Sequence, residues 1–218
     1  MAKLRVAVLI SGRGSNLQSL IDACAQPDFP AEIVLVISNR PGAYGLERAQ
    51  KAGIPAVTLD HKAYASKADF EAAIDAALAE ANVELVCLAG FMRLLSADFV
   101  RRWEGRMINI HPSLLPSFKG LHTHRQTLDA GVKIAGCTVH FVVPEMDAGP
   151  IIVQAAVPVL QGDDEDALAA RVLSQEHQIY PSALKWIAEG RVQIVDGRVQ
   201  IDGARSDTEA LRMPGLAE

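Results

Sequence analysis

Asn109 and His111 stand two residues apart at the end of an apolar run, 107–110. Side chains alternate along a strand, so an amide donor and a titratable imidazole on one side can face the same substrate atom. Ligands also tend to bind at the carboxyl ends of strands in α/β sheets. A histidine that only fills a strand end is the alternative, and the paired amide favours acid–base catalysis.

Asp147 stands in a turn before the apolar run 151–159. A carboxylate beside an imidazole orients the ring and stabilises its protonated form, which suits proton transfer near neutral pH. Taken alone, Asp147 is an ordinary turn residue. The serines Ser11, Ser15 and Ser113 lack the Gly-x-Ser-x-Gly pattern of a serine nucleophile. The sequence therefore offers no evident nucleophile.

His122 and His124 raise a metal hypothesis, because two imidazoles two residues apart share a face in an extended segment. No third ligand stands at a useful spacing, and the chain has no His-Glu-x-x-His motif. Beside Lys119 and Arg125, the pair is better suited to bind an anionic substrate or to shape a loop. We therefore expect no metal.

A glycine-rich segment, Ser-Gly-Arg-Gly-Ser-Asn at 11–16, stands between an expected strand and an expected helix. Backbone N–H groups and the helix dipole favour an anion there, and a tight turn with a serine N-cap is the structural alternative. Leu17 replaces the third glycine of the dinucleotide fingerprint, and no Gly-Lys-Ser/Thr closes a Walker loop. We expect a phosphate site without a nicotinamide cofactor.

A sheet has to hold these segments together. Over the first ninety residues, short β-branched runs alternate with alanine-rich stretches, a pattern typical of parallel strands joined by helices. Strands this apolar are buried on both faces. The sequence predicts an α/β fold with a Rossmann-like, doubly wound, mostly parallel sheet. The expected strands are 4–10, 32–38, 56–59, 85–88, 107–110, 132–141 and 151–159, and the expected helices are 15–25, 45–52, 66–81, 97–103 and 163–186.

The second half of the chain adds a long helix and a hairpin at 191–201, turned at Asp196-Gly197. Proline and glycine punctuate the stretch 111–126, which we expect to be an irregular, functional loop. The tail at 204–218 is polar and lacks periodicity, so we expect it to be mobile.

The composition excludes several classes of protein. The chain has 218 residues, 50% of them hydrophobic, and a formal net charge of −5, which disfavours a nucleic-acid-binding surface. No apolar stretch approaches the roughly 20 residues that cross a bilayer, and the N-terminus lacks a signal sequence. Three widely spaced cysteines indicate neither a disulfide framework nor a zinc site. We expect a cytoplasmic protein that binds neither membranes nor nucleic acids.

The chain contains five strings in this order: SGRGSN, LAGFMRLL, NIHPSLLPSFKGLHTHRQ, MDAGPII and SQEHQIYP. Together they resemble the phosphoribosylglycinamide formyltransferases, a family of folate-dependent formyltransferases in purine biosynthesis. The resemblance extends over about residues 4–190. The order and spacing of the strings make it specific, rather than any single glycine loop.

The resemblance implies transfer of a formyl group from 10-formyltetrahydrofolate, a cosubstrate, to the amine of 5-phosphoribosylglycinamide. It assigns Asn109, His111 and Asp147 as the polar catalytic trio. Asn109 and protonated His111 would stabilise the oxyanion that forms when the amine attacks, and Asp147 would keep His111 charged and oriented. This reaction requires neither a metal nor a covalent enzyme intermediate.

The resemblance also implies the binding residues. Gly14, Ser15 and Asn16 match the loop that binds the ribonucleotide phosphate, and Glu176 matches a carboxylate that holds the ribose hydroxyls. Composition alone would place 91–95 in the core, whereas the resemblance places 92–95 against the pteridine ring. The expected folate-binding residues are Lys67, Met92, Arg93, Leu94, Leu95 and Asn109.

Three positions depart from the family pattern. Arg13 stands where Asn is frequent and either adds a charge to the phosphate site or points into solvent. Lys67 replaces an Arg, which keeps the charge but loses bidentate geometry. Val143-Pro144 is less polar than usual, and Pro144 has no backbone N–H to offer a folate.

We expect residues 1–203 to form a single formyltransferase domain, in which 1–90 is the phosphate-binding half and 91–203 the folate-binding and catalytic half. The expected partners are the two small-molecule substrates, and the expected state is a monomer or homodimer.

Two alternatives remain open. A related formyltransferase or hydrolase would use methionyl-tRNA or water as the acceptor. The tRNA enzymes carry an additional C-terminal domain, and a negative net charge suits tRNA poorly. A non-catalytic module would hold a phosphorylated metabolite at 11–16 without turnover, which the catalytic trio disfavours.

Overall fold

Seven strands of the described chain form one sheet in the order β3-β2-β1-β4-β5-β6-β7, and a separate pair forms the hairpin β8-β9. The computed structural model describes residues 2–204 and 212–213. Strands β1 to β5 are parallel, whereas β6 and β7 are antiparallel to their neighbours. The strands are β1 (Leu4–Ile10), β2 (Ala31–Ser38), β3 (Ala56–Thr58), β4 (Leu85–Leu88), β5 (Met107–His111), β6 (Ile134–Phe141), β7 (Ile151–Pro158), β8 (Val192–Val195) and β9 (Arg198–Ile201).

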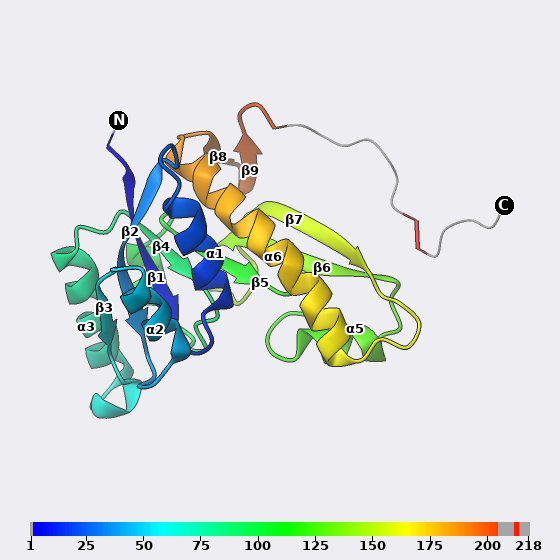
Figure 1. The fold of residues 1–218 in the computed structure, drawn as a ribbon, viewed down its shortest axis with the longest axis horizontal. Helices are drawn as coiled ribbons and strands as arrows, with labels where there is room; N and C mark the ends of the chain where they lie inside the picture. Colours follow the sequence, from blue (N-terminus) through cyan, green and yellow to red (C-terminus); the bar gives the residue numbers. More distant parts are fainter. Residues whose placement is uncertain (1, 205–211, 214–218) are drawn as a thin grey trace.

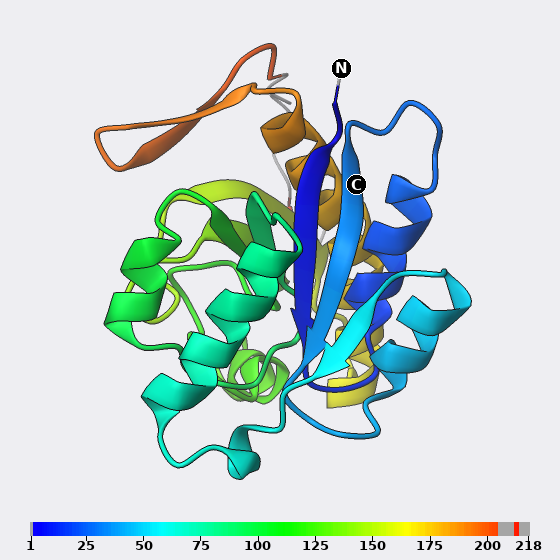
Figure 2. The same ribbon diagram turned by 90° about the vertical axis from the view of Figure 1, so that its left-hand side faces the viewer.

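Helices cover both faces of the sheet (Figure 1 and Figure 2). Val6 and Val8 of β1 pack into a core with α1, α2 and α6, whereas Ala7 and Leu9 pack into a second core with α3 and α4. Because successive residues of one strand are buried on opposite sides, the doubly wound prediction is confirmed. The helices are α1 (Ser15–Cys24), α2 (Tyr44–Lys51), the 3₁₀ helix η1 (His61–Ala63), α3 (Lys67–Glu80), α4 (Ala97–Arg102), α5 (Thr123–Asp129) and α6 (Glu165–Ala188).

The observed elements follow the sequence pattern closely. Strands β1 and β4 are confirmed residue for residue, and the other expected elements differ by one or two residues at their ends. The hairpin turns at Asp196 and Gly197, both with positive φ. The expectation of an irregular stretch at 111–126 is wrong at its end, because α5 begins at Thr123. A helix of this length shows too few turns for a periodic pattern to be recognised.

The parallel strands bring three segments to one edge of the sheet. Leu9 of β1 lies opposite Leu88 of β4, and Leu88 lies opposite Asn109 of β5. The glycine-rich loop, the segment 90–96 and His111 therefore all leave the sheet at the same edge. In residues 2–204 and 212–213, no helix combines the length and apolar character needed to cross a membrane. The tail expected to be mobile lies largely outside the described residues.

Tyr180 of α6 contacts two neighbouring strands, β4 and β5, near this edge. The side chain is fully buried, and its hydroxyl donates to the carbonyl oxygen of Leu88 at 2.9 Å, with the carbonyl of Ile108 3.4 Å away. Buried carbonyls need donors. The hydroxyl thus ties α6 to β4 and β5, directly before the residues that enter the site.

The variant Tyr180→Phe is expected to lower the free energy of unfolding by about 1–3 kcal/mol, because a buried carbonyl loses its donor while the ring is kept. Tyr44→Phe is the matched control, since Tyr44 is 45% exposed and should change the same quantity by no more than about 0.5 kcal/mol. Urea unfolding followed by circular dichroism measures both. Equal values for the two variants would contradict the role given to the Tyr180 hydroxyl.

Candidate active site

His111 ends β5, is buried, and has a contact at each ring nitrogen. Nε2 lies 3.0 Å from the carbonyl oxygen of Phe118, and a carbonyl can only accept, so Nε2 carries a proton. Nδ1 lies 3.6 Å from Oδ2 of Asp147, which is too far for a hydrogen bond. The carboxylate can therefore stabilise positive charge on the ring while a proton on Nδ1 stays available to a substrate atom.

Asp147 is fixed by the backbone around it. Its Oδ2 accepts from the N–H of Gly120 at 2.8 Å, and its φ of +50° lies in the left-handed region. Such a conformation costs about 1–3 kcal/mol and persists only where the surroundings hold it. Gly149 provides close packing, because a Cβ there would lie 1.8 Å from the carbonyl oxygen of Phe141. The turn that carries Asp147 therefore lies directly against the end of β6.

His140 of β6 lies opposite Asn109 and is 2% exposed. Its Nδ1 donates to the carbonyl oxygen of Phe141 at 2.8 Å. Burial is the main cause that lowers the pKa of His140, so the ring is neutral and Nε2 is unprotonated. Nε2 then accepts from Nδ2 of Asn109, 3.3 Å away. This contact shows that Nδ2 of Asn109, and not its Oδ1, faces His140. The second N–H of Nδ2 remains available to a substrate oxygen.

Sequence reasoning missed His140. The signal was present in the expected strand 132–141, which carries polar side chains at Thr138 and His140 on the same side. Antiparallel pairing with β5 places Thr138 opposite His111 and His140 opposite Asn109. That register depends on the length and shape of the intervening chain, which includes α5, so the sequence pattern alone did not reveal the pairing.

The glycine-rich loop is shaped by its own backbone. Gly14 is the N-cap of α1 with a φ of +69° and no side-chain cap, so the alternative of a serine N-cap is wrong. Ser15 and Asn16 form the first turn, where backbone N–H groups lack helical partners and favour an anion. Gly45 of α2 packs against the loop, because a Cβ on Gly14 would lie 2.7 Å from the Gly45 Cα.

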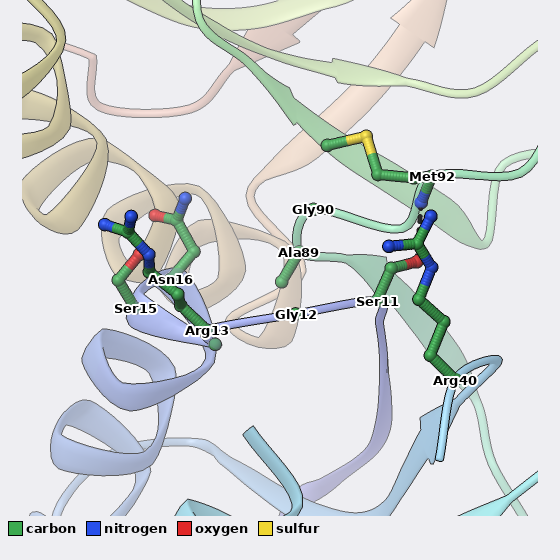
Figure 3. Close-up of a pocket in the computed structure, with 10 residues that line it drawn as sticks. Ser11, Gly12, Arg13, Ser15, Asn16, Arg40, Ala89, Gly90 and Met92 are labelled. Atoms are coloured by element: carbon green, nitrogen blue, oxygen red, sulfur yellow. Dashed lines mark hydrogen bonds between the residues drawn. The ribbon is translucent and has the colours of Figure 1, made fainter. Parts of the chain in front are cut away.

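Two arginines line the pocket beside this loop (Figure 3). The guanidinium of Arg13 lies at the end where α1 begins, and that of Arg40 lies at the other end, near Ser11 and Met92. Arg13 is exposed and also lines this pocket, so an added charge at the anion site stays a prediction. Arg40 was not expected from the sequence.

Asn16 and Glu176 are 160 residues apart in sequence and directly bonded. Nδ2 of Asn16 donates to Oε2 of Glu176 at 2.7 Å, and Glu176 is 6% exposed. Burial is the main cause that raises the pKa of Glu176, and the Asn16 bond opposes it. Oδ1 of Asn16 is buried without a partner in the described chain. The loop and α6 thus present polar groups that a hydroxylated, anionic ligand would satisfy.

The segment after β4 is exposed, not core. Met92 and Leu94 are 57% and 71% exposed, and Arg93 is also exposed. The interpretation from composition is therefore wrong for these positions, whereas Leu95 packs partly against the core. The exposure of apolar side chains at the sheet edge is typical of a binding surface.

The far end of this segment is anchored by a buried carboxylate. Glu71 of α3 is 3% exposed and accepts from the backbone N–H of Ser96 at 2.6 Å and from its hydroxyl. Nζ of Lys67 lies 3.9 Å from Glu71, with its side chain 47% exposed. Lys67 therefore lies at the same edge with its ammonium accessible. Pro144 is exposed in the loop between β6 and β7.

His122 and His124 do not share an extended segment. His122 has a φ of +55° and precedes α5, which contains His124, and residues two apart on a helix do not face each other. Burial is the main cause that lowers the pKa of His124. Among residues 2–204 and 212–213, no three His, Cys, Asp or Glu side chains are grouped so as to hold a metal ion.

The expected site residues thus form neighbouring groups along one edge. Asn109, His111 and Asp147 form one group, and none of them lines the pocket beside the glycine-rich loop. That pocket continues to Met92, which links it to the exposed segment after β4 (Figure 3).

The formyl transferase family profile matches residues 4–184. The chain is 47% identical to phosphoribosylglycinamide formyltransferase of Escherichia coli over 93% of this chain and 95% of that protein. It is 57% identical to the trifunctional purine biosynthetic protein adenosine-3 of Bos taurus over 90% of this chain, but 20% of that protein. A crystal structure of glycinamide ribonucleotide transformylase 1 from Symbiobacterium toebii matches with a TM-score of 0.89 and 51% identity, covering 91% of this chain and 94% of that one.

The chain spans about a fifth of the length of the trifunctional relatives that it matches. It spans nearly all of the bacterial relative, and the similarity includes the strands and loops described above. The chain therefore belongs to the formyl transferase family and, within it, to the phosphoribosylglycinamide formyltransferases.

Proposed function

We propose that this chain transfers the formyl group of 10-formyltetrahydrofolate to the amine of 5-phosphoribosylglycinamide in purine biosynthesis. The observation that carries the proposal is the arrangement at β5. A buried imidazole has a carboxylate 3.6 Å from Nδ1, and an amide is oriented beside it by a neutral histidine. This arrangement suits an oxyanion that forms on a carbonyl, and it occurs in a member of this family.

The reaction forms one C–N bond and breaks another. The substrate amine attacks the formyl carbon, and negative charge gathers on the formyl oxygen. Asn109 donates its free Nδ2–H to that oxygen, and His111 donates from Nδ1. When the C–N bond to the folate breaks, the departing folate nitrogen gains a proton and the attacking amine nitrogen loses one. His111 or a water molecule carries the proton between them. Asp147 stabilises the imidazolium throughout.

The binding residues divide between the two substrates. The ribonucleotide phosphate binds the N–H groups of Gly14, Ser15 and Asn16, with Arg13 adding charge, and the ribose hydroxyls bind the free oxygen of Glu176. The pteridine ring binds Met92–Leu95, and the ammonium of Lys67 faces a folate carboxylate. We treat 1–203 as one domain, because a single sheet runs across the boundary expected at residue 90. The cytoplasmic location and the oligomeric state remain predictions.

Incubation with both substrates tests the proposal, with deformylation of the folate followed by absorbance. Parallel reactions offer methionyl-tRNA or water as the acceptor. We expect turnover with 5-phosphoribosylglycinamide and none above background with the others. Turnover only with another acceptor would replace this proposal by the related transferase or hydrolase, and ligand binding without turnover would indicate a non-catalytic module.

The variants His111→Ala and Asp147→Asn are each expected to lower kcat by about 10²–10⁴-fold. His111→Ala removes the proposed proton donor, and Asp147→Asn removes the negative charge that stabilises it. In Asp147→Asn, the amide oxygen of the new side chain would still accept from the Gly120 N–H, so the loop is retained. Since the two residues act as a unit, the double variant should lose little more than the worse single variant. Steady-state kinetics measures all three, and additive losses would contradict a shared role.

When kcat is measured as a function of pH, its decrease at acid pH is expected to depend on His140. Protonation of Nε2 would turn it from an acceptor into a donor facing Asn109, so kcat should fall at acid pH. His140→Gln offers an amide oxygen near the position of Nε2 and does not titrate, so its acid limb should be flatter, whereas His140→Leu should lose activity at every pH. If kcat decreases at acid pH in His140→Gln as steeply as in the native chain, His140 does not have this role.

The free energy of unfolding should also decrease at acid pH because of His140. Because burial lowers the pKa of His140, the unfolded chain binds a proton at a higher pH than the folded chain. The free energy of unfolding should therefore fall as pH drops below about 6.5. Thermal unfolding at several pH values should show a shallower fall in His140→Gln.

The variant Glu176→Gln is expected to raise KM for 5-phosphoribosylglycinamide by about ten- to a hundredfold, because hydrogen bonds to a charged group contribute about 1.5–3 kcal/mol. The KM for the folate should stay within about twofold. Kinetics with each substrate varied in turn separates the two constants. A rise in the folate KM alone would remove Glu176 from the ribonucleotide site.

A further inference from the structure

Ser11, at the end of β1, connects two loops through its hydroxyl. Its side chain is buried, and its Oγ lies 2.7 Å from the backbone nitrogen of Met92 (Figure 3). Its Oγ also lies 2.5 Å from Oδ1 of Asn39. A backbone N–H can only donate, so Oγ accepts from Met92. The single hydroxyl proton is then donated to Asn39. The direction of both bonds is therefore determined.

Asn39 follows β2 and is fully buried. Because its Oδ1 accepts from Ser11, its Nδ2 is the end that faces Nδ1 of His61, 3.3 Å away. The backbone nitrogen of Asn39 also lies 3.4 Å from the carbonyl oxygen of Ile10. The hydroxyl of Ser11 is thus held in place by a residue that is itself fixed on the sheet.

The two loops that Ser11 connects face different substrates. Ser11 begins the glycine-rich loop, which forms the anion site three residues later at Gly14. Met92 begins the segment 92–95, whose far end is held by Glu71 through Ser96. The segment is therefore anchored at one end by α3 and at the other by the phosphate loop. The first residue of the phosphate loop and the first residue of the segment thus share one hydrogen bond.

We infer that Ser11 is a positioning residue that couples the two substrates, so that a ribonucleotide on the phosphate loop favours the backbone position in which segment 92–95 binds the folate. This inference rests on the proposed function, because it takes the loop and the segment as the two binding sites. Coupling of this kind is reciprocal: each substrate tightens the other by the same factor.

Calorimetry tests the coupling with tetrahydrofolate and 5-phosphoribosylglycinamide, a pair that binds without turnover. The Kd for tetrahydrofolate is measured alone and with saturating ribonucleotide, and the ratio is the coupling factor. Couplings of this type are typically about 5- to 150-fold. We expect a factor of at least about fivefold in the native chain and less than about twofold in Ser11→Ala, with reciprocal values for the ribonucleotide.

Ser38→Ala is the matched control. Ser38 is the fully buried last residue of β2 at the same sheet edge, but within the described chain its hydroxyl hydrogen-bonds only with the backbone of Arg40. Its coupling factor should equal that of the native chain. An unchanged factor in Ser11→Ala, or an equal loss in Ser38→Ala, would overturn the inference.

A second measurement needs no variant. Hydrogen exchange of the Met92 amide in the native chain should slow when ribonucleotide saturates the loop, and inorganic phosphate should give part of the effect. Unchanged exchange under saturating ribonucleotide would overturn the coupling even if Ser11→Ala fails to fold. Absence of binding and turnover in the native chain would instead overturn the proposed function, so the two failures are distinguishable.

Discussion

This site requires three neighbouring parallel strands, β1, β4 and β5, to end at the same edge of the sheet. The ladder aligns Leu9, Leu88 and Asn109 across β1, β4 and β5, and neighbouring strands lie about 4.8 Å apart. The glycine-rich loop, the segment 90–96 and His111 each leave one of these strands. Burial of both sheet faces holds this alignment, since a slip of one residue would exchange the side chains between the two cores. Chemistry at the edge therefore depends on apolar packing behind it.

Two histidines on adjacent strands receive opposite environments. His111 lies beside a carboxylate, which suits a charged ring, and His140 donates to a carbonyl in a buried position, which suits a neutral ring. Antiparallel pairing places them two residues apart in register across β5 and β6. This strand pair thus holds one imidazole beside the carboxylate of Asp147 and a second imidazole whose Nε2 accepts from Asn109.

The strands, most helices and the motif residues could be predicted, because their signals are local. Short apolar, β-branched runs identified β1 to β7, and the strings around Asn109, His111 and Asp147 carried the family resemblance. His140 was missed because its role arises from a pairing register that the chain between β5 and β6 sets. Met92 and Leu94 looked like core from composition, since an apolar side chain gives no local sign of whether a protein or a ligand will cover it. Arg40 and Ser11 likewise acquire their neighbours only through the sheet order.

The bond between Asn16 and Glu176 spans 160 residues, and this separation imposes an order on synthesis. A nascent chain carries the glycine-rich loop early, but the carboxylate that accepts from Asn16 is translated only with α6. Asn109, His111, His140 and Asp147 are all translated before it. Under the proposed function, a chain arrested short of α6 would carry the groups proposed for formyl transfer but would lack the carboxylate proposed to bind the ribonucleotide.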